Sequence, residues 1–458
     1  MVTGKSQTEA YGIWGSGVAL AFVIVAALGL FVFVLFNGSL ALWPRQLEEF
    51  KLKDGTTILG SLVDEGVSSA INENGNTAND KIEKRNRILV NQGNRDIVSR
   101  EFIWLWSDEI VNREIPKEAV IIERKEWGPL IGYAEQGSEF NSDYLPSGDL
   151  SLTTSDGTKR TIHAEKISRV TMPNALGFFG KLNVYFSKIL EFLTQDPRES
   201  NTEGGVFPAI FGTILVVLTM TIFVAPLGVL TALYLREYAK QGPLVTVVRI
   251  SVSNLAGVPS IVFGVFGVGF FVYGLGAFID DNFFRQSLPT PTFGTGGLLW
   301  ASITLSLLTL PTVIVSAEEG LAAIPMHVRE ASYALGATKF ETMIKVVLPA
   351  LVPSILTGVI LAIARAAGEV APLMITGVVK LAPSLPLDGT WPFLHLDRKF
   401  MHLGFHIFDV GFQSPNIEAS RPMVYMTTLL LLTIVVVLNL GAMVVRQRLR
   451  QRYSISGI

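Results

Sequence analysis

The segment Arg329–Glu369 reads REASYALGATKFETMIKVVLPALVPSILTGVILAIARAAGEV. Its first half is polar and helix-prone around Gly336, whereas its second half is a long apolar run that carries Arg365 and Glu369. A run of this length is long enough to cross a bilayer, which takes about 20 residues. A polar helical segment that continues directly into a membrane span with a charge pair suggests a device that passes motion into a membrane path.

The composition places the rest of the chain around this segment. Of the 458 residues, 49% are hydrophobic and 17% are charged, whereas soluble domains carry about a quarter charged residues. The net charge of −2 gives no indication of nucleic-acid binding, and the absence of cysteine excludes disulfides, iron–sulfur clusters and Cys-based zinc sites. The chain is therefore predicted to be a polytopic α-helical membrane protein with a soluble part.

Six apolar runs are predicted to cross the membrane as helices, because a helix satisfies every backbone polar group within the segment. The runs are Ile13–Phe36, Val206–Leu235, Ile250–Ile279, Gly297–Ala317, Ala350–Val379 and Met423–Val445. The first run is too long for a signal-peptide core and lacks a cleavage pattern, so we expect an uncleaved span. Pro259, inside the third run, is the best candidate for a functional bend, although helix packing is the default use of such residues.

The runs divide the chain into four parts: an N-terminus with the first span (1–44), a soluble insert (45–203), a five-helix membrane domain (204–446) and a basic tail (447–458). In the insert, Asp54-Gly55 and Asp156-Gly157 are each flanked by alternating apolar residues, which predicts two hairpins. The two segments resemble each other, so a duplicated β-unit is possible. The segment Ile71–Asn94 is expected to be a loop. Residues 174–193 predict an amphipathic helix, either against the membrane surface or packed on its own domain.

Basic residues near the span ends predict the orientation of the chain. The C-terminal tail carries Arg446, Arg448, Arg450 and Arg452, which places it in the cytoplasm. Six spans then place the N-terminus there too, put residues 329–345 inside and leave the insert outside.

The segment that follows the fourth span also contains a motif. Glu330-Ala331-Ser332, Gly336 and Leu348-Pro349 resemble the EAA loop of ABC-importer permeases, with the spacing kept in full. Ser332 replaces the usual third-position Ala, and Val346 replaces Ile. The resemblance implies a type I ABC-importer permease fold, in which this loop and the preceding Arg329 seat in a groove of an ATPase subunit.

A narrower resemblance covers the chain from Asn201 to its C-terminus together with the first span. The sequences NTEGG, APLGVLTALYLREY, VPSIVFG, REASYALG and LTGVILAIARAAGEVAPL are similar to those of PstA-type permeases of the phosphate importer. The insert lies outside this likeness, and Val370 stands where Thr is common. The resemblance implies a multi-pass protein of the bacterial inner membrane that guides phosphate and contacts lipid, not nucleic acid.

The same resemblance implies the other components. They are a second, PstC-type permease subunit, a dimer of PstB-type ATPase subunits and an extracytoplasmic, PstS-type phosphate-binding protein. The chain itself is expected to be no enzyme and to need no cofactor, because ATP would be bound by the partner. Its Gly4-Lys5-Ser6 lacks the preceding strand and Gly-rich loop of a phosphate-binding motif.

Arg365 and Glu369 are four residues apart and are expected to share a helix face near the middle of their span. A charge there must be paired or face water. Either Arg365 offers donors to an oxyanion in transit while Glu369 weakens its grip, or the pair only locks the helix to a partner. Ser253, Asn254 and Ser260 could line the same path, or form interhelical hydrogen bonds. Conduction requires that any such site be weak.

Other polar residues receive simpler interpretations. Glu318 and Glu319 are expected to be solvated or paired with Arg329 or a partner. His395, His402 and His406 fall in one loop and could bind a metal, although HLGFH lacks the Glu of a zinc peptidase and ordinary surface histidines are the preferred interpretation.

The sequence leaves three alternative functions open. The chain could be the PstC-type partner, a permease for sulfate or molybdate, or a membrane-anchored sensor that signals through its cytoplasmic helix.

Overall fold

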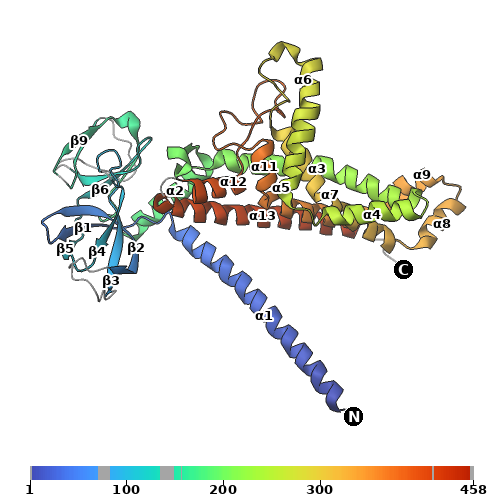
Figure 1. Ribbon diagram of the computed structural model, residues 1–458, viewed down its shortest axis with the longest axis horizontal. Helices are drawn as coiled ribbons and strands as arrows, with labels where there is room; N and C mark the ends of the chain where they lie inside the picture. The colour runs from blue at the N-terminus through green and yellow to red at the C-terminus, as the bar shows by residue number, and fades with distance from the viewer. Residues whose placement is uncertain are drawn as a thin grey trace, which may run out of the picture. The chain divides into compact units, whose positions relative to one another are not determined.

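The structure, a computed structural model, describes residues 3–70, 83–98, 100–134, 149–155, 157–414 and 417–453. The chain forms two compact units, one of Met1–Gly205 with Ser414–Met426 and the other of Val206–Gln413 with Thr427–Ile458. The first contains the predicted insert and α1 (Thr3–Leu40), and the second contains most of the apolar helices (Figure 1).

Six helices in the described part of the chain are long and apolar enough to cross a membrane, which confirms the predicted number. They span Trp14–Leu40, Phe207–Tyr238, Ser260–Phe283, Leu298–Ala323, Lys339–Gly368 and Ile417–Leu449. The corresponding elements after α1 are α3 (Phe207–Leu233) with η3 (Tyr234–Tyr238), α5 (Ser260–Phe266) with η4 (Gly267–Gly276) and α6 (Ala277–Phe283), α7 (Leu298–Ala323), α9 (Lys339–Thr342) with η6 (Met343–Val347) and α10 (Leu348–Gly368), and α13 (Ile417–Tyr453).

The third span begins at Ser260, so the predicted start at Ile250 is wrong. The residues before the break form a separate helix, α4 (Pro243–Leu255). Pro259 is extended, with φ −54° and ψ 135°, and precedes the first residue of α5. Proline has no N–H to donate and disfavours the helical conformation of the residue before it, so the apolar run cannot continue as one helix.

The fifth apolar run is also interrupted, and the predicted span to Val379 is wrong. Helix α10 ends at Gly368, Glu369 is extended with ψ 136°, and a short helix α11 (Ala371–Thr376) follows. Pro372 lies four residues after Gly368, so it cannot donate to the Gly368 carbonyl, and its ring would clash with that group. The charge pair Arg365 and Glu369 therefore lies at the end of a helix, rather than in its middle.

The helical unit is held together by close contacts at small residues. A Cβ added to Gly228 of α3 would lie 2.6 Å from the Val313 side chain of α7, and one added to Gly358 of α10 would lie 3.0 Å from the Val313 Cα. The buried core between these helices is apolar: Val216, Met220, Val224, Leu305, Leu308, Val313, Ala362 and Ala366. Helices α3, α7 and α10 thus form the centre of the unit.

Gly264 gives α5 its close approach to α11. We expect Gly264→Ala to lower thermal stability, because the new Cβ would lie 2.7 Å from the Pro372 Cα, a backbone atom that cannot swing aside. Overpacking of this kind costs about 1–3 kcal/mol, measurable as a lower melting temperature of the purified chain in detergent. Gly269→Ala is the matched control, because its Cβ would meet nothing within 4 Å. Equal melting temperatures for the two variants would contradict the prediction.

The insert is β-rich, as predicted, and consists of two five-stranded antiparallel sheets. The first contains β1 (Leu47–Leu52), β2 (Thr57–Ala70), β3 (Glu83–Asn91), β4 (Phe102–Trp106) and β5 (Ile110–Glu114) in the order β4-β3-β2-β1-β5. The second contains β6 (Ala119–Arg124), β7 (Leu130–Ala134), β8 (Leu150–Thr153), β9 (Lys159–Ile162) and β10 (Ile167–Thr171) in the order β10-β6-β7-β8-β9. In both, four strands form a meander and the fifth pairs with the first.

This repeated topology agrees with a duplicated β-unit, but the two similar segments are not equivalent within it. The hairpin at Asp54-Gly55 joins the first two strands of its sheet, with Gly55 at φ +85°. The second hairpin joins β8 and β9, the third and fourth strands of the other sheet; Asp156 lies outside the described residues. The expected loop Ile71–Asn94 is wrong for its second part, where β3 pairs with both β2 and β4; residues 71–82 lie outside the described residues.

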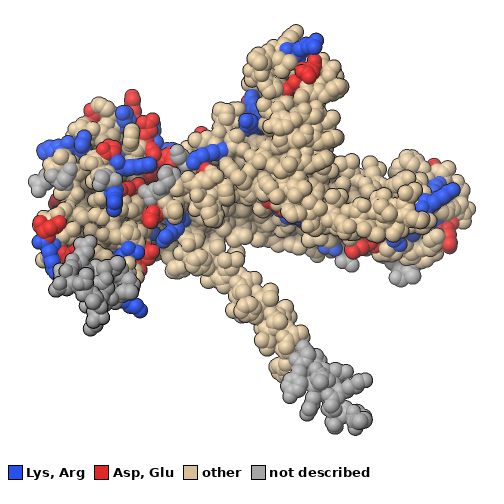
Figure 2. Space-filling model, viewed as in Figure 1, with Lys and Arg blue, Asp and Glu red and all other residues tan. Residues whose placement is uncertain are grey.

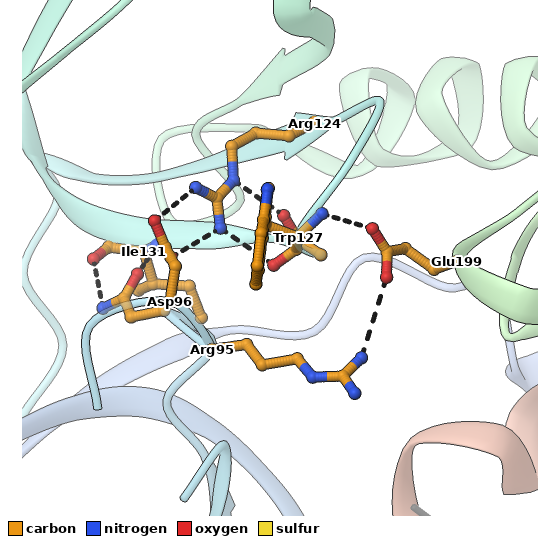
Figure 3. Close-up of polar contacts among 8 residues, drawn as sticks. Arg95, Asp96, Arg124, Trp127, Ile131 and Glu199 are labelled. Atoms are coloured by element: carbon orange, nitrogen blue, oxygen red, sulfur yellow. Dashed lines mark hydrogen bonds and ion pairs between the residues drawn. The ribbon is translucent and has the colours of Figure 1, made fainter. Parts of the chain in front are cut away.

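A buried arginine joins the two sheets (Figure 3). Arg124 at the end of β6 donates from Nη1 and Nη2 to both carboxylate oxygens of Asp96, which follows β3, at 3.0 and 2.9 Å. Arg124 also donates to the carbonyls of Trp127 and Gly128, and its hydrogen bonds hold the pKa of Asp96 below its usual range. Glu199 accepts from the Trp127 N–H and lies 3.7 Å from Arg95. The cluster fixes the sheets to the chain segment that leads toward α3.

The predicted amphipathic helix is α2 (Phe178–Thr194). The remaining short elements are η1 (Ala164–Lys166), β11 (Pro197–Arg198), η2 (Glu199–Asn201), β12 (Glu203–Gly204), η5 (Arg285–Ser287), α8 (Met326–Ala334), α12 (Leu403–Phe408) and η7 (Asp409–Gln413). On the face shown in Figure 2, charged side chains are scattered over the β-rich insert, whereas the middle of the helical unit carries few.

Candidate functional site: a helical hairpin joined to a broken membrane helix

Helices α8 and α9 form a hairpin at one end of the helical unit (Figure 1). Gly336 lies between them with φ +86°, a left-handed conformation that favours glycine. Thr338 then starts α9 with a capping box, in which its hydroxyl accepts from the Glu341 N–H and the Glu341 carboxylate accepts from the Thr338 N–H. The predicted order of helix, Gly break and second helix is present, and α9 continues through η6 into α10.

Arg329 fixes this hairpin to the rest of the unit. Its side chain is buried and donates to the carbonyls of Ile324 and Leu321 at 2.8 and 3.0 Å. It also donates to the Glu237 carboxylate of η3 at 2.9 Å, and Lys339 of α9 donates to the Glu237 carbonyl. Two basic residues of the hairpin therefore hold the end of the second membrane span.

Glu318 has a different partner from the predicted one. It pairs with Arg249 of α4 at 3.1 Å rather than with Arg329, because Glu237 already occupies the Arg329 guanidinium. Glu319 is exposed. The Arg249–Glu318 pair ties α4 to α7 and takes no part in the hairpin.

The hairpin exposes several large apolar side chains beside its charged ones. Glu330 and Ala331 are exposed, whereas Ser332 points inward and hydrogen-bonds the Thr342 hydroxyl at 2.8 Å. Leu348 and Pro349 are half-buried in the first turn of α10. The exposed large apolar residues are Met326, Tyr333, Leu335, Phe340 and Ile344. Such a projecting apolar surface is suited to seating in a groove of a partner protein.

At the far end of α10, Arg365 forms an ion pair with Glu369, with Nε 3.4 Å from Oε1. This distance is long for a charged hydrogen bond, so the guanidinium is loosely held. Arg365 is in the last turn of α10 and Glu369 is the residue at which the helix opens. Broken helices at membrane depth occur where the free backbone groups line a cavity or are buried in protein. The geometry can therefore present a cationic group beside open backbone.

The loop after α11 returns to this break through α12. The Leu403 N–H donates to the Thr213 hydroxyl of α3 at 2.9 Å. A Cβ added to Gly404 would lie 2.9 Å from the Val370 side chain, the residue that follows Glu369. The start of α12 therefore packs against Val370, the residue after the helix break.

His402 precedes α12 and His406 lies within it, and the expectation of surface histidines is wrong for both. They are 0% and 2% exposed, because α12 is packed into the unit on both sides. Among the described residues, Nε2 of His402 and both ring nitrogens of His406 have no hydrogen-bond partner. Burial lowers the pKa of each histidine to about 4, against an ordinary value of 6.5. His395 instead pairs with Asp388 at 3.0 Å.

The two buried histidines should make the fold less stable in acid. Their folded-state pKa values are depressed, so their neutral forms stabilise the fold above about pH 6.5, and this contribution is lost as the pH falls toward 4. Compared with neutral pH, each histidine should lower the free energy of unfolding by about 2 kcal/mol at pH 5. The groups that face His406 are Asp409 and Lys380, which form an ion pair at 3.0 Å.

We expect His406→Phe to reduce the fall in melting temperature of the purified chain between pH 7.5 and pH 5. His163→Asn should leave that fall unchanged, because its imidazole is 71% exposed and paired with Asp149. The prediction fails if both variants lose as much stability on acidification as the parent chain. His402→Gln gives a second measurement should the larger ring not fit.

The predicted path residues of the third span are not all in that span. Ser253 and Asn254 are exposed in the last turn of α4, and Ser260 is the half-buried first residue of α5. Among the described residues, none of the three hydrogen-bonds Arg365. The role of these residues remains a prediction.

A cavity of about 670 Å³ lies in the unit that contains the insert. Its charged lining residues are Arg45, Arg95, Lys188, Arg198, Glu101, Glu123, Glu126, Glu191, Glu199, Glu203 and Glu418. Burial and the neighbouring Glu123 raise the pKa of Glu203 to about 7. Because carboxylates predominate, this cavity is a poor site for an oxyanion, and the Arg365 region is the better candidate.

Residues 224–454, just over half of the chain, match the family described as binding-protein-dependent transport system inner membrane component. The chain belongs to this family. The matched region begins within α3 and ends one residue after α13, so it contains both the α8–α9 hairpin and the helix break. The permease is accordingly a multi-pass transport protein of the inner membrane, and six apolar helices with the ABC-importer permease fold agree with that family.

Several relatives of the permease carry more specific names. A probable ABC transporter permease protein, YqgH of Bacillus subtilis, is 37% identical over 43% of this chain and 62% of its own length. The phosphate transport system permease proteins PstA of Mycobacterium leprae and Yersinia pestis are 40% and 35% identical, over 38% and 46% of this chain and 51% and 68% of their own lengths. The permease thus resembles PstA-type proteins, but spans less than two thirds of the first two relatives.

Proposed function

We propose that this permease is the PstA-type transmembrane subunit of an ATP-driven phosphate importer. The observation that carries the proposal is the continuous path from the anchored α8–α9 hairpin through η6 and α10 to the Arg365–Glu369 break. The names of the relatives support phosphate as the substrate. By the same likeness the partners are a PstC-type permease, two PstB-type ATPase subunits and a PstS-type binding protein.

ATP is bound and hydrolysed by the ATPase subunit rather than by the permease. The apolar face of Leu335, Phe340 and Ile344 seats in that subunit, with Glu330 and Ala331 at its edge. When the ATPase subunits close, α8 and α9 move with them. Because α9 continues into α10 and Arg329 holds η3, the movement reaches two membrane spans together as a rigid-body displacement.

Phosphate passes the end of α10. Arg365 supplies donors to the oxyanion, while Glu369 competes for the same guanidinium, so that the anion is held weakly and leaves. Of the three path residues predicted in the third span, Ser260, beside the break at Pro259, lies in that span. Ser253 and Asn254 would contribute only at the exposed end of α4.

The orientation proposed from the basic tail is N-terminus and C-terminus in the cytoplasm. In Figure 1 the C-terminal end of α13 and the α8–α9 hairpin lie at the same end of the helical unit. Both therefore face the cytoplasm if either does. The insert, residues 45–203, would then face the outside.

The test is transport by the assembled complex in proteoliposomes. We expect ATP-dependent accumulation of labelled phosphate that excess sulfate or molybdate does not inhibit. Inhibition by either of those anions would instead identify a different oxyanion importer. ATP-independent signalling without any accumulation would favour a membrane-anchored sensor. Exchange of this chain for its partner permease distinguishes the PstA-type from the PstC-type position.

A further inference from the structure

Helix α2 has an uncharged apolar face that the insert does not cover. With about 100° per residue, one sector about 120° wide contains Phe178, Phe179, Leu182, Phe186, Ile189, Leu190 and Leu193. Four of these side chains are largely exposed: Phe178 by 66%, Phe179 by 82%, Phe186 by 59% and Leu190 by 63%. Exposed apolar surface of this extent on one helix indicates an interaction site.

The opposite face of α2 is fixed to the insert by ion pairs, so the helix cannot turn its apolar face inward. Glu191 is buried and pairs with Arg169 of β10 at 2.8 Å and with Arg198 at 2.6 Å. Lys188 pairs with Glu123 of β6 at 2.5 Å. The charged residues thus hold α2 on the β-rich insert and direct its apolar sector away from it.

Both ends of α2 are tied to the ends of membrane spans. At its N-terminal end, Phe178 and Tyr185 pack on Trp43, with ring centroids 6.2 and 5.7 Å apart, and Trp43 follows shortly after the end of α1 at Leu40. At its C-terminal end, the Gly205 N–H donates to the Asp196 carbonyl just after the helix. Phe207, two residues later, begins α3, and two residues of chain reach at most about 7 Å.

We propose that α2 lies in the membrane interface at which α1 ends and α3 begins, with Phe178, Phe179, Phe186 and Leu190 inserted among the lipids. Two spans whose ends are held at the two ends of one helix place that helix at the depth of those ends. A Trp–Tyr–Phe cluster beside a span end is typical of the aromatic belt at the headgroup level. The apolar sector then covers the acyl boundary while the ion-paired face carries the insert.

The occupant is lipid rather than a partner protein on two grounds. The sector contains no charged or hydrogen-bonding group that would give a protein specificity, and Trp43, which follows the end of α1, packs on Phe178 at one end of it. The inference concerns the insert and its anchoring, and it is independent of which anion is transported. Loss of anchoring would leave the substrate preference unchanged.

The absence of cysteine in this chain makes the test direct. Phe186→Cys and Leu190→Cys each receive a nitroxide label in the full chain, reconstituted in liposomes alone and together with its partner subunits. We expect both labels to collide more often with oxygen, which concentrates in lipid, than with a water-soluble nickel chelate. Val111→Cys on β5, which is 67% exposed on the insert, should show the reverse.

Two results would overturn the proposal. Nickel accessibility at Phe186 and Leu190 equal to that at Val111 would leave the face in water. Shielding from both reagents only when the partner subunits are present would assign the face to a protein contact. Phe179→Cys, at the most exposed position of the sector, repeats the measurement where folding is least affected.

Discussion

Replacing Arg365 with Gln should reduce phosphate uptake by the assembled complex by about 10–100-fold. A hydrogen bond to a charged group is worth about 1.5–3 kcal/mol, and each 1.4 kcal/mol is a factor of ten in rate. The variant keeps a side chain of similar length but removes the cation from the end of α10 and leaves Glu369 unpaired in a partly buried position. The measurement is the initial rate of labelled phosphate uptake, normalised to the amount of assembled complex.

The matched control is Arg249→Gln. The Arg249–Glu318 pair has nearly the same exposure as Arg365–Glu369, 36% and 20% against 35% and 19%, but it links α4 to α7 away from the helix break. Uptake by this variant should stay within about threefold of the parent, as for a partly exposed pair worth about 1 kcal/mol or less. Glu369→Gln should raise phosphate affinity and slow release, since the competing carboxylate is removed. Equal uptake by the Arg365 and Arg249 variants would assign Arg365 a purely structural role.

Replacing Arg329 with Gln should uncouple ATP hydrolysis from transport. The buried guanidinium donates to Glu237 and to two carbonyls, and loss of one partner from a buried ion pair costs about 3–5 kcal/mol. The α8–α9 hairpin would then move without η3. We expect ATPase activity of the complex to continue while binding-protein-stimulated phosphate uptake falls by at least about tenfold.

Lys345→Gln is the control for this change, because its pair with Glu341 is exposed on the same hairpin and should matter little. The reversed pair, Glu237→Arg with Arg329→Glu, should restore part of the uptake if the ion pair itself transmits the movement. Preserved coupling in Arg329→Gln would show that α9 and α10 transmit the movement without η3.

Features encoded by neighbouring residues were predictable from the sequence. The six apolar runs, the hairpin at Asp54-Gly55 and the Gly336 break each depend on side-chain preferences within a few residues, so the local pattern was sufficient. The breaks at Pro259 and after Gly368 also have local causes. Pro259 was the predicted candidate for a bend, but both apolar runs were predicted to continue as single spans, because hydropathy alone does not show where a proline ends a helix.

The surroundings of the site were less predictable. Arg329 finds Glu237 on a segment far away in the chain, and hydropathy and spacing contain no signal for that pair. His402 and His406 read as polar loop residues, yet the loop packs between α3 and the helix break and buries them. In the structure Nδ1 of His402 accepts from the Gly404 N–H and caps α12, but histidine is not a residue type that marks a helix start in a sequence.

By itself, the sequence determined that this chain crosses the membrane several times, that it contains a β-rich insert and that a Gly-broken hairpin leads into a span with two charges. Those properties follow from local hydropathy and backbone preference, which act over short stretches. Only the tertiary structure decided where the charge pair lies, which residue holds the hairpin and which face of α2 is free. Those properties depend on which distant segments pack together, and burial, unlike periodicity, is set by the whole fold.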